Sequence, residues 1–230
     1  MATLHVLRVF CDEEGEWGNP LGVFLDGAEV PAERRQAVAR ELGFSETVFV
    51  DDAGRGECRI FTPAAELPFA GHPSVGTAWL LAREGVPIDV LRPPAGEVAV
   101  RCQGELTFVT ARAEWSPPWE LLQLADAASV EWLVGPPPGE EMAYCWAWVD
   151  EAAGVVRSRS FPLEEGIEED EATGSAAIVL CERLGRPLTI HQGRGSLLDA
   201  RPLGDGRAEV GGRVVLDEVR EHQFRRRSMN

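Results

Sequence analysis

The sequence contains no lysine, and all 22 of its basic residues are arginine. A pyridoxal phosphate enzyme needs a lysine to form its Schiff base, and a P-loop enzyme needs one to contact the nucleotide phosphates. The absence of lysine therefore argues against both classes of enzyme.

Cysteine and histidine are sparse and widely spaced. There are five cysteines (Cys11, Cys58, Cys102, Cys145 and Cys181) and four histidines (His5, His72, His191 and His222). No Cys-x-x-Cys pair occurs and no two histidines have a metal-ligand spacing. We therefore expect reduced cysteines in the protein core and neither a structural nor a catalytic metal.

Basic charge and long apolar runs are also lacking. The net charge is −16, which argues against nucleic acid as the main partner, because phosphate binding needs a basic surface. The one basic cluster, Arg225–Arg227, is predicted to be a solvated tail. No apolar run is long enough for a membrane span, and Met1–Arg8 has the pattern of a strand rather than a signal peptide. We therefore expect a cytoplasmic protein that does not bind membranes.

Two similar segments lie about a hundred residues apart. Residues 66–78 and, more weakly, 168–177 place acidic residues and then glycine before an almost wholly apolar helix. The start of a helix exposes unpaired N–H groups and a partial positive charge, so it favours an anion. If the two helix starts face each other, they define a cleft for a small anionic substrate, a carboxylate. Arg59–Pro63 and Arg159–Pro162 repeat at a similar spacing, which indicates two related halves.

The pattern predicts an α/β fold. The helices expected at 73–83 and 175–184 are apolar on nearly all sides, so each is predicted to be buried among strands. This indicates two sheets, each curled around one central helix, in halves 1–114 and 115–230. The linker is placed at 115–119, where two prolines interrupt the pattern. A short helix at 119–127 and a hairpin turn at Gly211–Gly212 are also expected.

Several residues near the predicted helix starts are candidates for chemistry. Glu46, at the start of a strand, is either a solvated acid or a general base whose pKa is raised by apolar walls. His72 has either a structural role or a place in the site, where a helix start favours the neutral imidazole. Asp170 either caps a helix or belongs to the site.

The remaining candidates bind substrate rather than react with it. Ser175 is not in a Gly-x-Ser-x-Gly motif, so we interpret it as a hydrogen-bond donor to an anion and not as a nucleophile. Gly71 and Gly174 would let a ligand approach the backbone closely.

Four motifs occur in order over nearly the whole chain: Asn19–Phe24, Ser45–Phe49, Phe61–Pro63 with Leu67–Pro73, and Glu169–Asp170 with Ala172–Ala177. Together they resemble the PhzF-like (phenazine biosynthesis F) isomerase family. The resemblance implies a diaminopimelate epimerase-like fold of two pseudo-symmetric halves, a homodimer and proton transfer without a cofactor. It implies that Glu46 moves a proton between carbon atoms and that His72, Asp170 and Ser175 line the site.

The sequence departs from its apparent relatives at a few positions. Ala70 and Thr173 stand where the related racemases carry two catalytic cysteines, so a two-thiol racemase or epimerase is the least favoured alternative. Glu171 replaces the usual proline, and the loop after His191 is shortened to residues 192–196. These two changes leave open a second alternative, a protein that binds a small acid without turning it over. The sequence does not identify the substrate.

Overall fold

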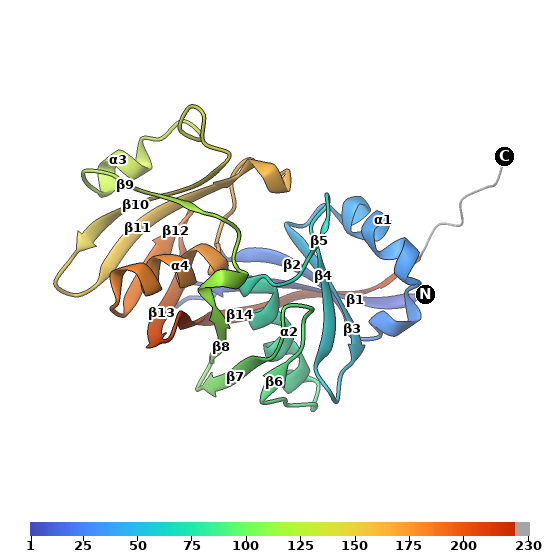
Figure 1. The fold of residues 1–230 in the computed structure, drawn as a ribbon. Helices are drawn as coiled ribbons and strands as arrows, with labels where there is room; N and C mark the ends of the chain where they lie inside the picture. Colours follow the sequence, from blue (N-terminus) through green and yellow to red (C-terminus); the bar gives the residue numbers. More distant parts are fainter. Residues whose placement is uncertain (224–230) are drawn as a thin grey trace.

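The computed structural model describes residues 1–223, in which fourteen strands join one hydrogen-bonded network (Figure 1). The main path of strands runs β5-β4-β3-β2-β1-β14-β13-β12-β11-β10-β9, and β6, β7 and β8 branch from β14. The two predicted sheets are thus connected to each other. Within this part of the chain, no helix is both long and apolar enough to cross a membrane. The Arg225–Arg227 cluster lies outside the described residues.

The N-terminal part places two long helices on opposite faces of its strands. Its elements are β1 (Ala2–Cys11), β2 (Asn19–Phe24), α1 (Ala32–Leu42), β3 (Glu46–Asp52), β4 (Glu57–Phe61), β5 (Glu66–Leu67), α2 (Gly71–Arg83), β6 (Val90–Leu91), β7 (Val98–Gln103) and β8 (Leu106–Arg112). Successive strand residues face opposite sides of a sheet. Phe49 accordingly belongs to a small core with Val38 of α1, whereas Val48 joins the main core with Val75 of α2.

The boundaries of α1 follow its end signals. Pro31 directly precedes the helix, and Gly43 ends it in the left-handed conformation at φ 71°. Because glycine has no Cβ, it adopts this conformation without steric cost. The chain then enters β3, which pairs in parallel with β2 and brings Glu46 opposite Leu21.

The C-terminal part repeats this alternation of strands and helices. Its elements are β9 (Glu120–Gln123), α3 (Ala127–Glu131), β10 (Met142–Asp150), β11 (Val155–Pro162), the 3-10 helix η3 (Leu163–Glu165), α4 (Gly174–Leu184), β12 (Leu188–Gln192), β13 (Ser196–Gly204) and β14 (Arg207–His222). The helix predicted at 119–127 is wrong. Residues 120–123 pair in parallel with β10, and Asp126 caps α3 by accepting a 2.8 Å hydrogen bond from the Ser129 amide.

A second correction concerns Gly211 and Gly212, which lie inside β14 and do not form a turn. A Cβ atom on Gly211 would come within 2.3 Å of Phe108, and one on Gly212 within 2.8 Å of Phe10. Glycine is needed here because rings from β8 and β1 pack directly on the strand. The uninterrupted β14 pairs with β8 and β13 near its start and with β1 farther along, and it thereby joins the whole sheet.

The helices α2 and α4 lie among the strands of the N-terminal and the C-terminal part, respectively, and approach each other at their starts (Figure 1). Ten of the residues of α2 and seven of those of α4 are buried, and both helices contribute to one large core. The prediction that both helices are buried is therefore confirmed. Of the five cysteines predicted to be in the core, four are buried and Cys102 is exposed, because it lies near the end of β7 beside the turn to β8.

Candidate active site

The starts of α2 and α4 meet at Gly71 and Gly174. A Cβ atom on Gly71 would lie 2.7 Å from the carbonyl carbon of Gly174, and one on Gly174 would lie 3.0 Å from the Cα of Gly71. Neither helix has a side-chain cap or an acidic residue in its first turn within the described chain. Two positive helix ends without side-chain caps are therefore held against each other.

A pocket opens at this junction. It contains all six residues that the sequence singled out, and its walls are formed by Glu46, Leu67, Phe69, Ala70, Gly71, His72, Pro117, Trp119, Glu165, Asp170, Thr173, Gly174 and Ser175. One small cavity is thus shared by residues from both sides of the predicted linker, although they lie far apart in the sequence.

Glu46 lies at the start of β3 and is only 6% exposed. Its Oε2 atom is buried and has no hydrogen-bond partner among the described residues. Burial, and then the negative charges of Asp170 and Glu165, raise the pKa of this carboxyl well above its usual range. The environment is the one that tunes a carboxyl group toward acid–base chemistry near neutral pH.

His72 faces this carboxyl from the first turn of α2. Its Nε2 atom lies 3.4 Å from Glu46 Oε2, but the two atoms are not aligned for a hydrogen bond, and both are unpartnered. Burial lowers the pKa of His72 to about 3, so the imidazole is neutral at physiological pH. The pair therefore has one carboxyl that readily holds a proton beside a ring that does not.

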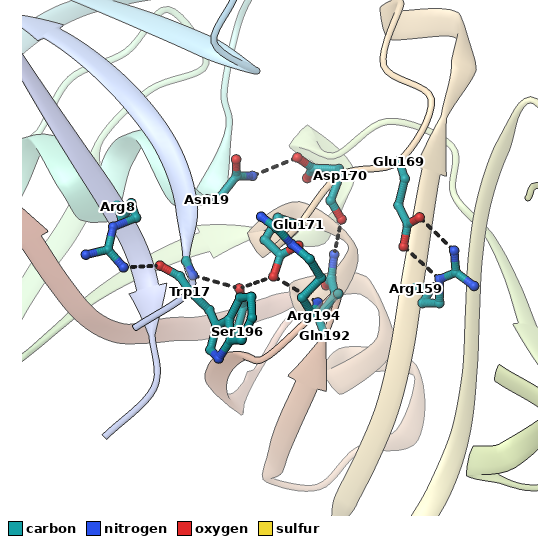
Figure 2. Close-up of polar contacts among 12 residues, drawn as sticks. Arg8, Trp17, Asn19, Arg159, Glu169, Asp170, Glu171, Gln192, Arg194 and Ser196 are labelled. Atoms are coloured by element: carbon teal, nitrogen blue, oxygen red, sulfur yellow. Dashed lines mark hydrogen bonds and ion pairs between the residues drawn. The ribbon is translucent and has the colours of Figure 1, made fainter. Parts of the chain in front are cut away.

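Asp170 is buried and does not cap α4. Its Oδ1 atom accepts a 2.7 Å hydrogen bond from the Asn19 amide, and its Oδ2 atom accepts one of 2.6 Å from the Thr173 hydroxyl (Figure 2 shows Asn19 and Asp170). Burial raises the pKa of Asp170 to about 6, although both hydrogen bonds act to lower it. Asp170 is thus a second buried carboxyl of the pocket whose orientation is fixed.

Gln192, a fully buried residue of β12, fixes the backbone before α4. Its side chain accepts a 3.1 Å hydrogen bond from the Thr173 amide and donates one of 3.0 Å to the Asp170 carbonyl. The Tyr144 hydroxyl donates to the same Gln192 oxygen at 3.1 Å. This buried network links the start of α4 to β10 and β12.

Ser175 has a partner that the sequence did not predict. The indole Nε1 of Trp119 donates a 3.2 Å hydrogen bond to its Oγ atom. This contact orients the Ser175 hydroxyl and places the predicted linker itself in the pocket wall.

The two departures Glu171 and the shortened loop contact each other (Figure 2). The Glu171 carboxylate accepts hydrogen bonds from the Arg194 amide at 2.9 Å and the Ser196 hydroxyl at 3.1 Å. The Arg194 guanidinium lies over the Trp17 ring, 5.4 Å from its centroid. Glu171 therefore anchors the loop 192–196, and neither it nor residues 193–196 line the pocket.

Sequence reasoning missed four residues with a role in this site: Asn19, Trp119, Glu165 and Gln192. Asn19 lies in the motif Asn19–Phe24, and its place in this motif could have identified it as a candidate site residue. Trp119 lies in the predicted linker, Gln192 in the shortened loop and Glu165 in a run of acidic residues. None of these patterns indicates a site residue, and only the fold brings the three to the pocket or to the start of α4.

The positions of the racemase cysteines are also part of the pocket. Ala70 directly precedes α2, Thr173 directly precedes α4, and both line the cavity. None of the five cysteines of the chain does so. Two-thiol chemistry therefore has no candidate nucleophiles in the pocket.

The arrangement of the chain is shared with proteins of known structure. A hydroxyproline epimerase from Agrobacterium vitis superimposes with a TM-score of 0.60 at 14% identity, over 96% of this chain and 93% of that one. A phenazine biosynthesis protein of the PhzF family from Enterococcus faecalis superimposes with a TM-score of 0.78 at 23% identity, over 97% and 99%. The fold is thus a mixed α/β fold of the diaminopimelate epimerase-like class.

Sequence comparison identifies the family. The PhzC-PhzF family, described as phenazine biosynthesis-like protein, matches residues 7–131. A trans-2,3-dihydro-3-hydroxyanthranilate isomerase from Pseudomonas fluorescens is 33% identical, over 86% of this chain and 89% of the relative. The chain therefore belongs to the PhzC-PhzF family, and it is an isomerase of that family.

Proposed function

We propose that this isomerase moves a proton between two carbon atoms of a small carboxylate and that Glu46 is the acid–base group. One observation carries the proposal. The unpartnered, buried Oε2 atom of Glu46 lies in the same pocket as the two uncapped helix starts. A base and an anion-binding element are thus within reach of one small molecule.

In the proposed reaction, the backbone amides at Gly71–His72 and Gly174–Ser175 bind the substrate carboxylate. Glu46, as the carboxylate, takes a proton from a carbon atom activated by a conjugated system. The electron pair delocalises toward the substrate carboxylate, where the helix starts stabilise the added negative charge. Glu46, now the acid, returns the proton to a different carbon atom. The reaction neither consumes nor releases electrons, and it needs no cofactor.

His72 and Asp170 are proposed to orient the substrate or to relay a second proton. Both are buried, and both line the pocket. Because the neutral imidazole of His72 faces Glu46, it does not stabilise the Glu46 carboxylate as an imidazolium would. The proton on Glu46 is therefore retained until the substrate accepts it.

We further infer that residues 1–114 and 115–230 are two pseudo-symmetric halves. The order of elements supports this. Strands β2 and β3 are parallel, and α1 lies between them in the sequence. Strands β9 and β10 are likewise parallel, with α3 between them. An antiparallel strand and a buried helix follow in each case, first β4 and α2 and then β11 and α4. The pocket then lies between two copies of one unit.

The alternative of a binding protein without turnover depended on Glu171 and the shortened loop. Both lie outside the pocket wall, so they leave the proposed chemistry intact. The homodimer implied by the family resemblance also stays a prediction, and light scattering in solution tests it.

The test uses trans-2,3-dihydro-3-hydroxyanthranilate, the compound in the name of the Pseudomonas fluorescens relative. Turnover in heavy water is followed by NMR for wild type, Glu46→Gln and the exposed control Glu168→Gln. We expect conversion of the substrate with wild type and the control, and a loss of roughly 10²–10⁴-fold in turnover with Glu46→Gln. Equal turnover by Glu46→Gln would remove Glu46 from the mechanism. Binding without chemical change by wild type would favour the alternative.

A further inference from the structure

Glu165 is a third acidic side chain in the pocket, and the reaction proposed above does not use it. It is the last residue of η3, and Gly166 follows it in the left-handed conformation at φ 78°. Glu165 is half-buried, and it lines the pocket together with Glu46 and Asp170. No hydrogen bond or ion pair is formed by its carboxylate within residues 1–223. The fold therefore makes no visible use of this charge.

The acids around Glu165 behave differently. Asp170 is held by Asn19 and Thr173, and Glu169 forms a paired contact with Arg159 at 2.7 Å for both oxygens. The neighbouring Glu164 is exposed and does not line the pocket. Glu165 alone among these acids combines a place in the pocket wall with an unused carboxylate.

The charge of the pocket points to the kind of group that Glu165 meets. Among residues 1–223, its walls contain three acidic residues and no arginine, and its one histidine is neutral. A second independent feature is the buried Glu46 Oε2 atom, which has no partner and faces the same cavity. Burial first, and then Asp170 and Glu164, raise the pKa of Glu165 to about 7. A cation beside these acids would be strongly favoured, and a second anion disfavoured.

We propose that Glu165 is a specificity-determining residue, which accepts hydrogen bonds from a protonated amino group on the substrate and so selects zwitterionic acids over dicarboxylic and amine-free acids. This inference rests on the proposed function, because the helix starts must bind the carboxylate of the same molecule. The amine then lies at the acidic wall while the carboxylate lies at the junction of α2 and α4. A dicarboxylate would bring its second charge against Glu165.

The inference can be tested by equilibrium binding, separately from catalysis. The probes are 2-aminocyclohexanecarboxylate, cyclohexanecarboxylate and cyclohexane-1,2-dicarboxylate, measured by calorimetry at neutral pH. Wild type is expected to bind the amino acid about tenfold more tightly than the amine-free acid. Glu165→Gln and Glu165→Ala are expected to lose this preference, to bind the amine-free acid as wild type does, and to bind the dicarboxylate more tightly.

Two control variants separate the possible outcomes. Glu168→Gln, at an exposed acid outside the pocket wall, should bind all three probes as wild type does. Glu46→Gln should lose proton transfer but keep the preference for the amino acid. The role of Glu46 in catalysis and the role of Glu165 in selectivity are thus tested separately. The preference of wild type should also weaken as the pH falls below about 7, because Glu165 takes up a proton. A wild type without preference for the amino acid, or a Glu165→Gln variant that keeps it, overturns the proposal.

Discussion

The side-chain amide of Asn19 donates a 2.7 Å hydrogen bond to Oδ1 of Asp170, although 151 residues separate the two in the sequence. The same nitrogen donates to the Ala172 carbonyl at 2.9 Å, and the Asn19 oxygen accepts from the Ser45 hydroxyl at 2.6 Å. One buried side chain thus joins β2, the residue before Glu46 and the segment that leads into α4.

Removing this link should destabilise the protein and perturb Asp170. We expect Asn19→Ala to lower the free energy of unfolding by about 2–3 kcal/mol, because a buried carboxylate and a carbonyl lose their donors. The pKa of Asp170 should rise above about 6, because the Asn19 hydrogen bond lowers it. Urea unfolding and an NMR titration measure the two effects. Ser45→Ala, which keeps both donors of Asn19, should cost about 1 kcal/mol, and equal effects of both variants would contradict this explanation.

The contact between the two helix starts should tolerate no side chain. Gly174→Ala would place its Cβ atom 3.0 Å from the Gly71 Cα, against backbone that cannot rotate away. We expect a loss of about 1–3 kcal/mol in stability and a much weaker affinity for carboxylates, because the two starts must separate. Gly135→Ala is the matched control, since nothing lies within 4 Å of the added atom. Thermal unfolding and calorimetry with cyclohexanecarboxylate compare the two, and similar results for both would refute the expectation.

Glu171 should matter for stability more than for the chemical step. Its carboxylate accepts hydrogen bonds from Arg194 and Ser196 but lies outside the pocket wall. We expect Glu171→Ala to cost about 1–2 kcal/mol, while the proton-transfer rate at saturating substrate changes little. Glu168→Ala, an exposed acid three residues away, should stay within about 0.5 kcal/mol of wild type. A large drop in turnover with unchanged stability would show that Glu171 acts on the substrate instead.

The raised pKa of Glu46 predicts how stability depends on pH. The folded protein binds this proton more tightly than the unfolded chain does, so the contribution is present at low pH and is lost as the pH rises from the ordinary value of 4.5 to the raised pKa. The slope is about 1.4 kcal/mol per pH unit for one proton. Glu46→Gln does not titrate, so its stability should fall less steeply with rising pH. Urea unfolding between about pH 5 and about pH 8 compares the two proteins, and parallel curves would mean that Glu46 has an ordinary pKa.

Much of this architecture follows from local patterns. The helices α2 and α4 can be predicted from the sequence because buried helices lack a polar face. Pro31 and Gly43 mark the limits of α1 to within one residue. The errors occurred where tertiary pairing overrides local preference. Residues 120–123 are a strand only because β10 lies beside them, and Gly211–Gly212 continue β14 only because Phe108 and Phe10 occupy the space of their side chains.

The site was predictable to a similar extent. Glu46, His72, Asp170 and the two glycines stand in motifs, so they could be named, and their roles stay predictions until variants are tested. Glu165 could not be named, because an acid in a run of acidic residues gives no sign of facing inward. Whether the Glu165 carboxylate reaches the cavity depends on the turn at Gly166 and on the distant residues that share the pocket wall, which no short window of sequence contains.

The abutting ends of α2 and α4 bring two partial positive charges together, and a bound anion adds to the negative charge that offsets them. A metabolite carboxylate therefore acts as a counterion for the fold as well as a reactant. Heat resistance should rise with the concentration of such an anion, even a non-reactive one, and fall again in strong salt. In a cell, the lifetime of this polypeptide would then follow the size of its own substrate pool.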